Sequence, residues 1–491
     1  MNKLIGIIVV LAIAAGVTWY VAGREPGPRI DITSPQAVIG HSGELAVAID
    51  TPHGKLSSLE VALVQDGKTL PVFSLQGSAA SGSASGSTGK TAAAGSAKAA
   101  GGAAAGLVRQ GKGRLLLTAA IGKQQIPQLV EGKARIVVTA SRPVLFGYRK
   151  VASSASRAIS VQLMPPIISI VSTGHYITQG GAEMVVYRVS PANVQSGVQV
   201  GSYQYPGFAA SGAHVATQDP GLKVAFFALL WDQDPNTPIS LYARDDAGNV
   251  AHAAFDYHVT PKSYPKSTLA VSDRFLERVV PPILANDPSF KVPDPSNLVD
   301  SFVRIDHDLA LKDDAEMVAL ARKTSPVMLW HGAWVQQRDS AVEAKFAEQR
   351  TFTHDGKVIG HEVHFGYDLA SVAGAPVTAE NSGRVLYAGW LDIYGNAVII
   401  DHGMGVQSLY GHMSSLEVRV GQSVSKGQEI GREGETGLAG GPHVHFSMLV
   451  DGHFVTPLDW WSPKWIRDRI MRKLDAIGAV TPSASGATAS R

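Results

Sequence analysis

Short segments in which apolar and polar residues alternate recur along much of the chain, and this pattern constrains the fold more than any other feature. Examples are ELAVAID, SLEVALVQDG and ARIVVTAS in the first third of the sequence, and AEMVVYRVS and KVAFFALLWD further on. Successive side chains of a strand point to opposite faces of a sheet, so alternation broken by Gly, Asp and Pro indicates short antiparallel strands. The sequence therefore predicts a mainly β protein.

Length and composition limit what such a protein can be. The chain has 491 residues, and a prior of roughly 150 residues per domain suggests about three domains. The formal net charge is +2, with Lys and Arg scattered, which argues against the basic stripe of a nucleic-acid-binding protein. There is no cysteine, so disulfides, thiolate metal sites and a cysteine nucleophile are excluded. Any metal ligands must be His, Asp or Glu.

The N-terminal segment is apolar and uncharged over residues 4–22. At a rise of about 1.5 Å per residue, a helix of this length spans a hydrocarbon layer of about 30 Å. The run is longer than the apolar core of a cleaved signal peptide, and Trp19 and Tyr20 stand near its far end. We expect residues 1–25 to form an uncleaved, single-pass anchor in the inner (cytoplasmic) membrane.

The two strand-rich blocks are expected to form β sandwiches. The first covers residues 26–165, and its insertion at residues 77–106 is almost wholly Gly, Ala and Ser and is expected to be disordered. The second covers residues 166–262, with strands about every ten residues. Its segment ARDDAGNVA resembles the late strands of bacterial immunoglobulin-like domains. We expect both domains to act as spacers or docking modules.

The pattern changes to helical spacing over residues 263–325, a short helical connector. FLERVVPPIL, LVDSFVRIDHDLA and AEMVALARK carry apolar residues three and four apart, and Pro281 and Pro282 are expected to break the first helix. Residues 326–462 return to short strands with Gly-rich turns, as in an antiparallel β-sheet domain. Residues 463–491 are expected to form a helix packed on that domain and a loose tail.

Histidines are concentrated in this last β domain, since nine of 16 lie between His331 and His453. The candidate functional residues are His364 and Asp368 in HFGYD, His412 in LYGHMS, and His443 and His445 in GPHVHF. A catalytic zinc ion takes three protein ligands and keeps a fourth position open, and without thiolates the ligands are imidazole and carboxylate. These side chains supply the required donors.

The spacing of the candidates fits strands. Gly366 between His364 and Asp368, together with the β-rich flanks, favours a strand or strand-turn setting for that pair. His443 and His445 are two residues apart in a predicted strand, so their side chains project from one face. One of the two can then ligate a metal while the other meets a substrate. The neighbouring HEVH is one residue short of the helical HExxH signature.

Residues 346–461 resemble the lysostaphin-type, or M23, zinc metallopeptidases, whose motifs are HxxxD and HxH with a further histidine between them. HFGYDLAS, APVTAENSGRVLYAG, YGNAVIIDHG, LYGHMS, VGQSVSKGQEIG, TGLAGGPHVHF and PLDWW all follow in the family's order. The resemblance implies that His364, Asp368 and His445 bind one Zn²⁺ and that His412 and His443 are the unligated catalytic histidines. Which of these two is the general base stays open.

The function implied by the resemblance is that of a zinc metalloendopeptidase that cuts peptide bonds in peptidoglycan cross-links. With an anchor and β spacers, the active domain would lie in the periplasm or extracytoplasmic space, with peptidoglycan peptides as substrate. Cross-links between D-alanine and diaminopimelate are the first expectation, and glycine bridges the alternative. The alternatives from another class are a catalytically silent activator of other wall hydrolases and a scaffold whose zinc is structural.

Overall fold

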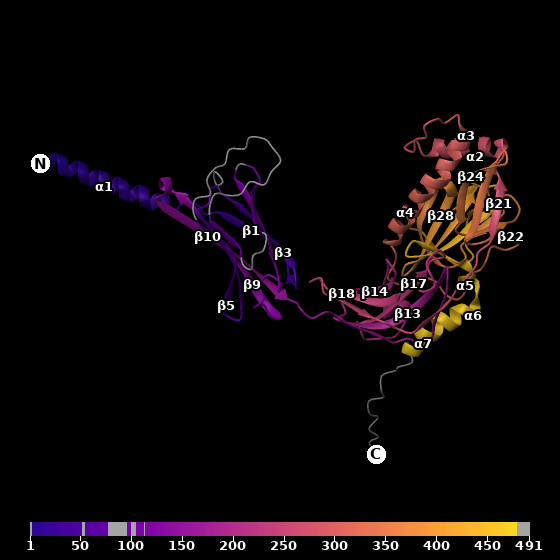
Figure 1. Cartoon of the computed structure of the whole chain (residues 1–491), viewed down its shortest axis with the longest axis horizontal. Helices are drawn as coiled ribbons and strands as arrows, with labels where there is room; N and C mark the ends of the chain where they lie inside the picture. The colour runs from indigo at the N-terminus through magenta and orange to yellow at the C-terminus, as the bar shows by residue number, and fades with distance from the viewer. Residues whose placement is uncertain (1, 52–54, 77–95, 100–104, 112, 479–491) are drawn as a thin grey trace, which may run out of the picture. The chain divides into compact units, whose positions relative to one another are not determined.

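The computed structural model describes residues 2–51, 55–76, 96–99, 105–111 and 113–478, and within them the chain is mainly β, which confirms the prediction (Figure 1). The chain divides into two compact units. The first comprises residues 1–166 and 244–250, and the second comprises residues 167–243 and 251–491. The domain limits drawn from the sequence are finer than this division, and they stay predictions.

The first unit contains two sheets around one hydrophobic core. The sheets have the strand orders β1-β3-β8-β7 and β2-β10-β9-β4-β5-β6, and buried Val47 and Leu117 of the first meet Leu59 and Val138 of the second in the same cluster. The elements are α1 (Asn2–Ala22), β1 (Arg29–Ser34), β2 (Val38–Ile39), β3 (Gly43–Asp50), β4 (Ser58–Gln65), β5 (Lys68–Gln76), β6 (Ser96–Ala99), β7 (Ala105–Arg109), β8 (Arg114–Ile121), β9 (Gly132–Val144), η3 (Leu145–Gly147) and β10 (Arg149–Val161).

Two expectations for this unit, the membrane anchor and the disordered insertion, are not confirmed. Among the described residues no helix is long and apolar enough to cross a membrane, so the predicted anchor finds no support there. The predicted disordered insertion, residues 77–106, lies mostly outside the described residues. Its described parts belong to β6 and to the start of β7, where the backbone pairs with β5 and β8.

The second unit begins with short sheets of the strand orders β11-β13-β17-β16, β15-β14-β18-β19 and β12-β20. The elements are β11 (Ile167–Ile170), β12 (His175–Thr178), β13 (Gly181–Ser190), β14 (Gln195–Val200), β15 (Tyr203–Pro206), β16 (Phe208–Ala209), η4 (Ala210–Ala213), β17 (Leu222–Leu229), β18 (Ile239–Arg244), β19 (Val250–Ala253) and β20 (Tyr257–Thr260). The likeness to immunoglobulin-like domains stays a prediction.

The helical connector consists of α2 (Asp273–Asn286), α3 (Leu298–Arg304), the π-helical turn η5 (Ile305–Leu309) and α4 (Ala310–Ala321). The prediction that Pro281 and Pro282 break the first helix is wrong, because α2 continues through both. A proline costs a helix one backbone hydrogen bond and a steric clash. Here Val280 and Ile283 on either side are completely buried, and we attribute the survival of the helix to that packing.

The last β domain is built on one antiparallel sheet of the order β22-β25-β33-β29-β28-β27-β31, with β34 beside β33. Two smaller sheets, β21-β23-β24 and β26-β32-β30, accompany it. The elements are β21 (Lys266–Ala270), β22 (Ala341–Ala344), β23 (Glu348–His354), β24 (Lys357–His364), β25 (Tyr367–Ala370), β26 (Pro376–Thr378), β27 (Gly383–Leu391), η6 (Asp392–Tyr394), β28 (Gly395–Gly403), β29 (Val406–Met413), β30 (Ser415–Leu416), β31 (Ser423–Val424), β32 (Glu429–Arg432), β33 (Val444–Val450) and β34 (His453–Val455).

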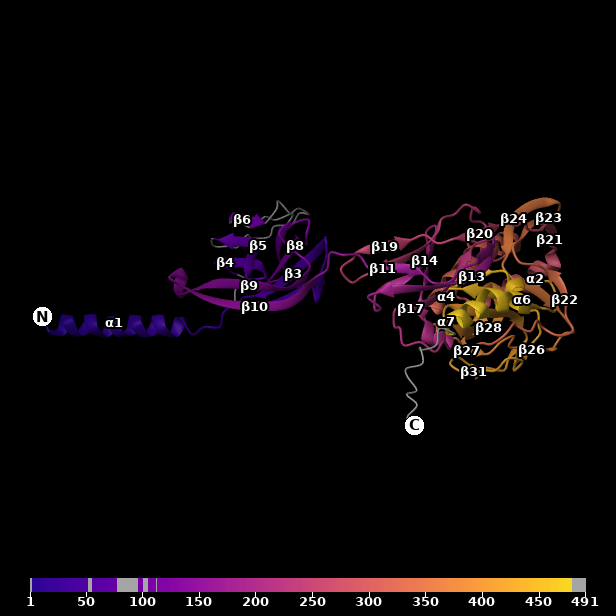
Figure 2. The same ribbon diagram turned by 90° about the horizontal axis from the view of Figure 1, so that it is seen from below.

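The chain then forms α5 (Pro457–Trp461), α6 (Pro463–Trp465), the π-helical turn η7 (Ile466–Met471) and α7 (Arg472–Gly478). Ile470 is buried, and the buried Lys473 ammonium donates a hydrogen bond of 2.8 Å to Glu183 on β13. These helices therefore lie against β13 of the preceding block of strands (Figure 2), and the expected packing on residues 326–462 stays a prediction. The predicted loose tail beyond residue 478 lies outside the described residues.

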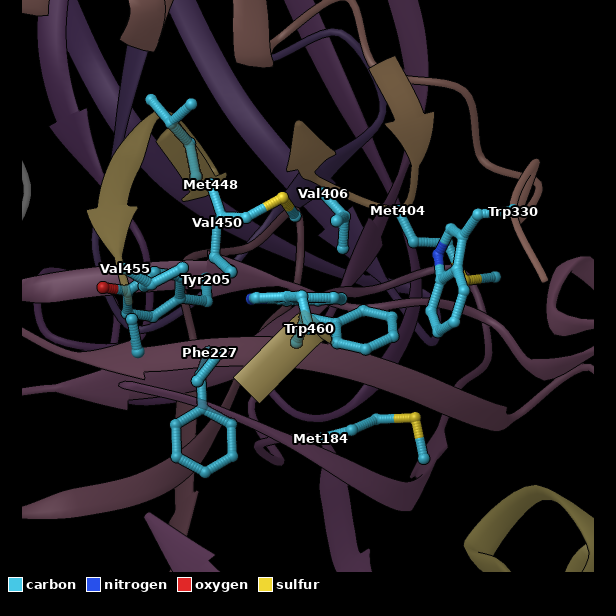
Figure 3. Packing of buried hydrophobic residues seen from close by; sticks show 14 of the residues in the cluster. Met184, Tyr205, Phe227, Trp330, Met404, Val406, Met448, Val450, Val455 and Trp460 are labelled. Carbon is cyan, nitrogen blue, oxygen red and sulfur yellow. The ribbon is translucent and has the colours of Figure 1, made fainter. Parts of the chain in front are cut away.

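Trp460 joins the early strands of the second unit to its last β domain (Figure 3). Its side chain is completely buried. The ring centroids of Phe226 on β17, Trp330 and Trp334 lie 6.1, 5.9 and 4.9 Å from its own. Burial of one such ring contributes several kcal/mol to stability. The sheet that carries the site described below therefore shares one core with the strands before it.

We expect Trp460→Ala to lower the free energy of unfolding by about 3–5 kcal/mol, because it removes a large ring from a closed core. Urea unfolding followed by far-UV circular dichroism measures the loss. The matched control is Leu458→Ala on the same helix, where the side chain is 44% exposed and the expected loss is below about 1 kcal/mol. Equal losses in the two variants would contradict the joining role of Trp460.

Candidate metal centre

Three neighbouring strand ends bring the predicted ligands together. His364 is the last residue of β24, and the chain turns at once into β25, which carries Asp368. β25 pairs with β33 so that Asp368 stands directly opposite His445, and β33 pairs with β29 so that His445 stands opposite Gly411. The strand-turn setting expected for the HxxxD motif is therefore what the backbone adopts.

The ligand atoms of this trio converge on one point. His364 Nε2 lies 2.9 Å from Asp368 Oδ1 and 3.0 Å from His445 Nδ1, and the last two atoms are 3.1 Å apart. All three residues are buried, and theirs is the one His/Cys/Asp/Glu group with converging ligand atoms among the residues that the structure describes.

The hydrogen bonds behind the two rings fix which nitrogens carry lone pairs. His364 Nδ1 lies 3.1 Å from the carbonyl oxygen of Lys345, and because a carbonyl only accepts, this nitrogen must carry the proton. Ser447 donates its hydroxyl proton to the Phe365 carbonyl, so its oxygen accepts from His445 Nε2 at 2.8 Å. His364 Nε2 and His445 Nδ1 then face each other with lone pairs, and both face a carboxylate oxygen. A divalent cation fits this donor set.

Gly366 makes the close approach of these groups possible. A Cβ atom at this position would lie 2.5 Å from His445 Nε2 and 2.7 Å from the Phe446 carbonyl oxygen. Both distances are far inside van der Waals contact. Any larger residue at position 366 would push the ring of His445 out of the trio.

The two remaining predicted histidines lie beside the trio without joining it. His412 has a left-handed backbone (φ 63°), which is rare outside glycine, and its Nδ1 donates to the Thr436 carbonyl at 2.8 Å. His443 Nδ1 donates to the Gly441 carbonyl at 2.9 Å, and its Nε2 lies 3.4 Å from Asp368 Oδ1. The ring centroids of His412 and His443 are 4.8 Å apart. In both rings Nδ1 makes the hydrogen bond to a backbone carbonyl, which leaves Nε2 for other partners.

Burial and neighbouring charges set different proton affinities for these groups. Burial lowers the pKa of His445 to about 4. Burial and the neighbouring His443 and His445 lower the pKa of His412 well below its ordinary value. Burial acts to lower the pKa of His443, but the Asp368 carboxylate and the Gly441 carbonyl together outweigh burial, and the net pKa is raised. His412 and His445 are therefore neutral near pH 7, as a metal ligand or a proton acceptor must be.

A cavity of about 720 Å³ opens beside the trio. It is lined by the five predicted residues and by Tyr394, whose ring centroid lies 5.2 Å from that of His445. The helical connector also contributes to the lining, with Phe302 of α3, Asp306 of η5 and Asp314 of α4. Burial raises the pKa of Asp306 to about 8 and that of Asp314 to about 6. The lining of the cavity thus includes both histidines and weakly acidic carboxyl groups.

The other histidines of the domain lie in structural surroundings or face solvent. His402 is completely buried and bonded to the Ser382 carbonyl and the Ser408 hydroxyl. His354 bonds to the Val271 carbonyl, and His453 packs edge-on against Tyr203. His361 is exposed at the rim of the cavity and does not reach the trio.

Sequence reasoning missed the groups that support the ligands. Ser447 and the Lys345 carbonyl orient the two ligand imidazoles, and the guanidinium of Arg350 lies 3.2 Å from Asp368 Oδ2. Ser447 had a local signal, because it stands two residues after His445 and so on the same face of β33. Arg350 lies 18 residues before Asp368 and had none.

Residues 362–457 match Peptidase family M23, so the chain contains an M23 domain in its C-terminal part. The HxxxD and HxH residues lie inside the matched segment. This agrees with the family resemblance of the motifs, and it covers the strands that build the trio.

Curated relatives match over the same part. The chain is 40% identical over 96 residues to the DD-carboxypeptidase/endopeptidase Mpg of Neisseria meningitidis serogroup B, which is 20% of this chain and 22% of that protein. It is 39% identical over 95 residues to the peptidoglycan DD-endopeptidase ShyA of Vibrio cholerae, 19% and 22% of the two chains. It is also 39% identical over 95 residues to the murein hydrolase activator EnvC of Escherichia coli, 19% and 23%. The chain spans less than a quarter of the length of each.

We expect His364→Ala to abolish tight binding of one Zn²⁺ per chain, because the trio would lose a third of its donors. Competition with a chromophoric chelator measures the affinity. His361→Ala, three residues away and outside the trio, is the matched control and should bind zinc as the unaltered chain does. Retained affinity in His364→Ala would show that the metal binds elsewhere.

Proposed function

We propose that this protein is a zinc-dependent endopeptidase that hydrolyses peptide bonds in peptidoglycan cross-links. The observation that carries the proposal is the convergence of His364 Nε2, Asp368 Oδ1 and His445 Nδ1 beside a cavity that also receives two unligated histidines. The M23 match and the endopeptidase relatives support the same reaction class. One zinc ion per chain is the cofactor expected.

Each residue of the site has a part in this reaction. His364, Asp368 and His445 would hold the ion, which when bound supplies Lewis-acid polarisation and lowers the pKa of water toward about 7. His412 is neutral and presents Nε2, so it can accept a proton, while His443 can stabilise developing negative charge or return a proton to the leaving amine. The assignment of base and acid between these two histidines stays open.

The substrate proposal also implies a location. Peptidoglycan lies outside the cytoplasmic membrane, so we place the M23 domain in the periplasm or extracytoplasmic space. An inner-membrane anchor over residues 1–25 remains part of the sequence-based expectation. Protease accessibility in intact and permeabilised cells tests the location.

The second candidate is an activator of other wall hydrolases, favoured by the 39% identity to EnvC. An activator works through a partner and has no use for a complete ligand trio with two oriented histidines beside it. A scaffold with structural zinc would close the fourth coordination position with protein, and no fourth donor converges on the trio among the described residues. The donor set therefore favours the enzyme.

We expect His443→Ala to lose wall cleavage by about 10²- to 10⁴-fold while zinc stays bound, because this imidazole takes part in proton transfer but not in the trio. Release of soluble fragments from purified peptidoglycan measures the rate, and metal analysis measures the zinc. His331→Ala, exposed and outside the cavity, is the control. An unaltered chain that binds zinc but releases nothing without a second hydrolase would favour the activator.

Mass spectrometry of the released fragments identifies the bond. We expect fragments cut between D-alanine and diaminopimelate. Cleavage within glycine bridges would replace this assignment and keep the endopeptidase, whereas cleavage of glycan bonds would contradict the proposed reaction.

A further inference from the structure

Arg350 on β23 lies among three carboxylates. Its side chain is 15% exposed, and Glu362 stands directly opposite it in the β23–β24 pairing. Its Nη1 is 3.6 Å from Glu362 Oε2, and its Nη2 is 3.8 Å from Glu348 Oε2. The shortest contact is from Nη2 to Asp368 Oδ2 at 3.2 Å, and it alone of the three is a hydrogen bond. The guanidinium is therefore directed at the carboxylate of the ligand trio.

The two oxygens of Asp368 have separate partners. Oδ1 faces His364, His445 and His443 at distances of 2.9, 3.1 and 3.4 Å. Oδ2 faces Arg350 instead. A carboxylate can bind a cation through one oxygen or through both, and binding through both takes up an additional coordination position.

We propose that Arg350 is a positioning residue of the metal centre. It holds Asp368 Oδ2 so that the carboxylate binds the metal through Oδ1 alone, which keeps a position open for water and substrate. The inference rests on the proposed metalloenzyme function and deepens it. Arg350 acts through Asp368, and Glu348 and Glu362, 3.8 and 3.6 Å from the guanidinium, hold it in place.

A purely structural role is the alternative. An arginine opposite a glutamate would stabilise the β23–β24 hairpin whether or not a metal is bound. The geometry favours positioning, because both Glu contacts are longer than a hydrogen bond and the contact to Asp368 is not. A guanidinium also suits this task better than an ammonium, because its planar fork fixes the direction of the bond as well as the charge.

The test compares full-length Arg350→Met with the unaltered chain in two measurements. Zinc affinity is obtained by competition with a chelator, and coordination is obtained from the visible absorption of the Co²⁺-substituted protein. We expect zinc affinity to fall by about 10- to 100-fold, as for other groups that orient metal ligands. We also expect the cobalt absorption to weaken, because a carboxylate that binds through both oxygens raises the coordination number. A role confined to the hairpin would leave the spectrum unchanged.

Arg432→Met is the matched control, because its guanidinium pairs with Glu429 at the surface, away from the trio. It should keep both zinc affinity and spectrum. If Arg350→Met does not fold, Arg350→Gln takes its place, since it keeps a polar side chain without the charge or the fork. A folded variant with unaltered affinity and an unaltered cobalt spectrum overturns the inference.

The same measurements separate this inference from the proposed function. If the unaltered chain binds zinc and cuts peptidoglycan while the Arg350 variants keep the original affinity and spectrum, the positioning role fails alone. If the unaltered chain binds no zinc, the metalloenzyme itself is refuted.

Discussion

Two imidazole lone pairs and a carboxylate oxygen about 3 Å from one another form the interaction on which this site depends. The orienting bonds from the Lys345 carbonyl and Ser447 fix the tautomers, so neither His364 nor His445 can donate to the other. Buried acceptors that face each other without a proton or a cation are costly. A bound cation removes that cost, and it links folding of the strand ends to metal binding.

Strand pairing sets the positions of the candidate ligands, and a small residue leaves the space that these positions require. Antiparallel pairing sets Asp368 opposite His445 and His445 opposite Gly411, so a register shift in either pair would turn a ligand to the other face. Gly366 leaves room for the ring of His445. His412 has a left-handed backbone near the end of β29. This conformation changes the direction of the chain there and so affects the direction of the His412 ring.

Much of the site could be predicted because its information is local. The two-residue spacing of His443 and His445 and the glycine between His364 and Asp368 indicate the strand settings, and the family resemblance implies which of these residues are ligands. The role of Arg350 could not be predicted in this way. An Asp-Gly turn at residues 355–356 would set Arg350 opposite His361 in a regular hairpin, but an extra residue in β24 shifts the register and brings Glu362 opposite it. The position of the connector helices could not be predicted for a similar reason. Their helical pattern is visible in the sequence, but their place beside the cavity depends on tertiary packing. Tertiary packing also explains why α2 continues through Pro281 and Pro282.

The choice between an enzyme and an activator depends on the donor set more than on sequence identity. At 39–40% identity the relatives include endopeptidases and a murein hydrolase activator, so a domain of this kind supports either role. In an activator, selection would act on the surface that contacts the partner. Buried metal ligands would then only lower the stability of the folded protein. In this chain three candidate ligand residues converge, two further histidines lie beside them, and Arg350 donates a hydrogen bond to the Asp368 carboxylate. Without a bound cation such an arrangement costs stability, and for this reason we propose an enzyme rather than an activator.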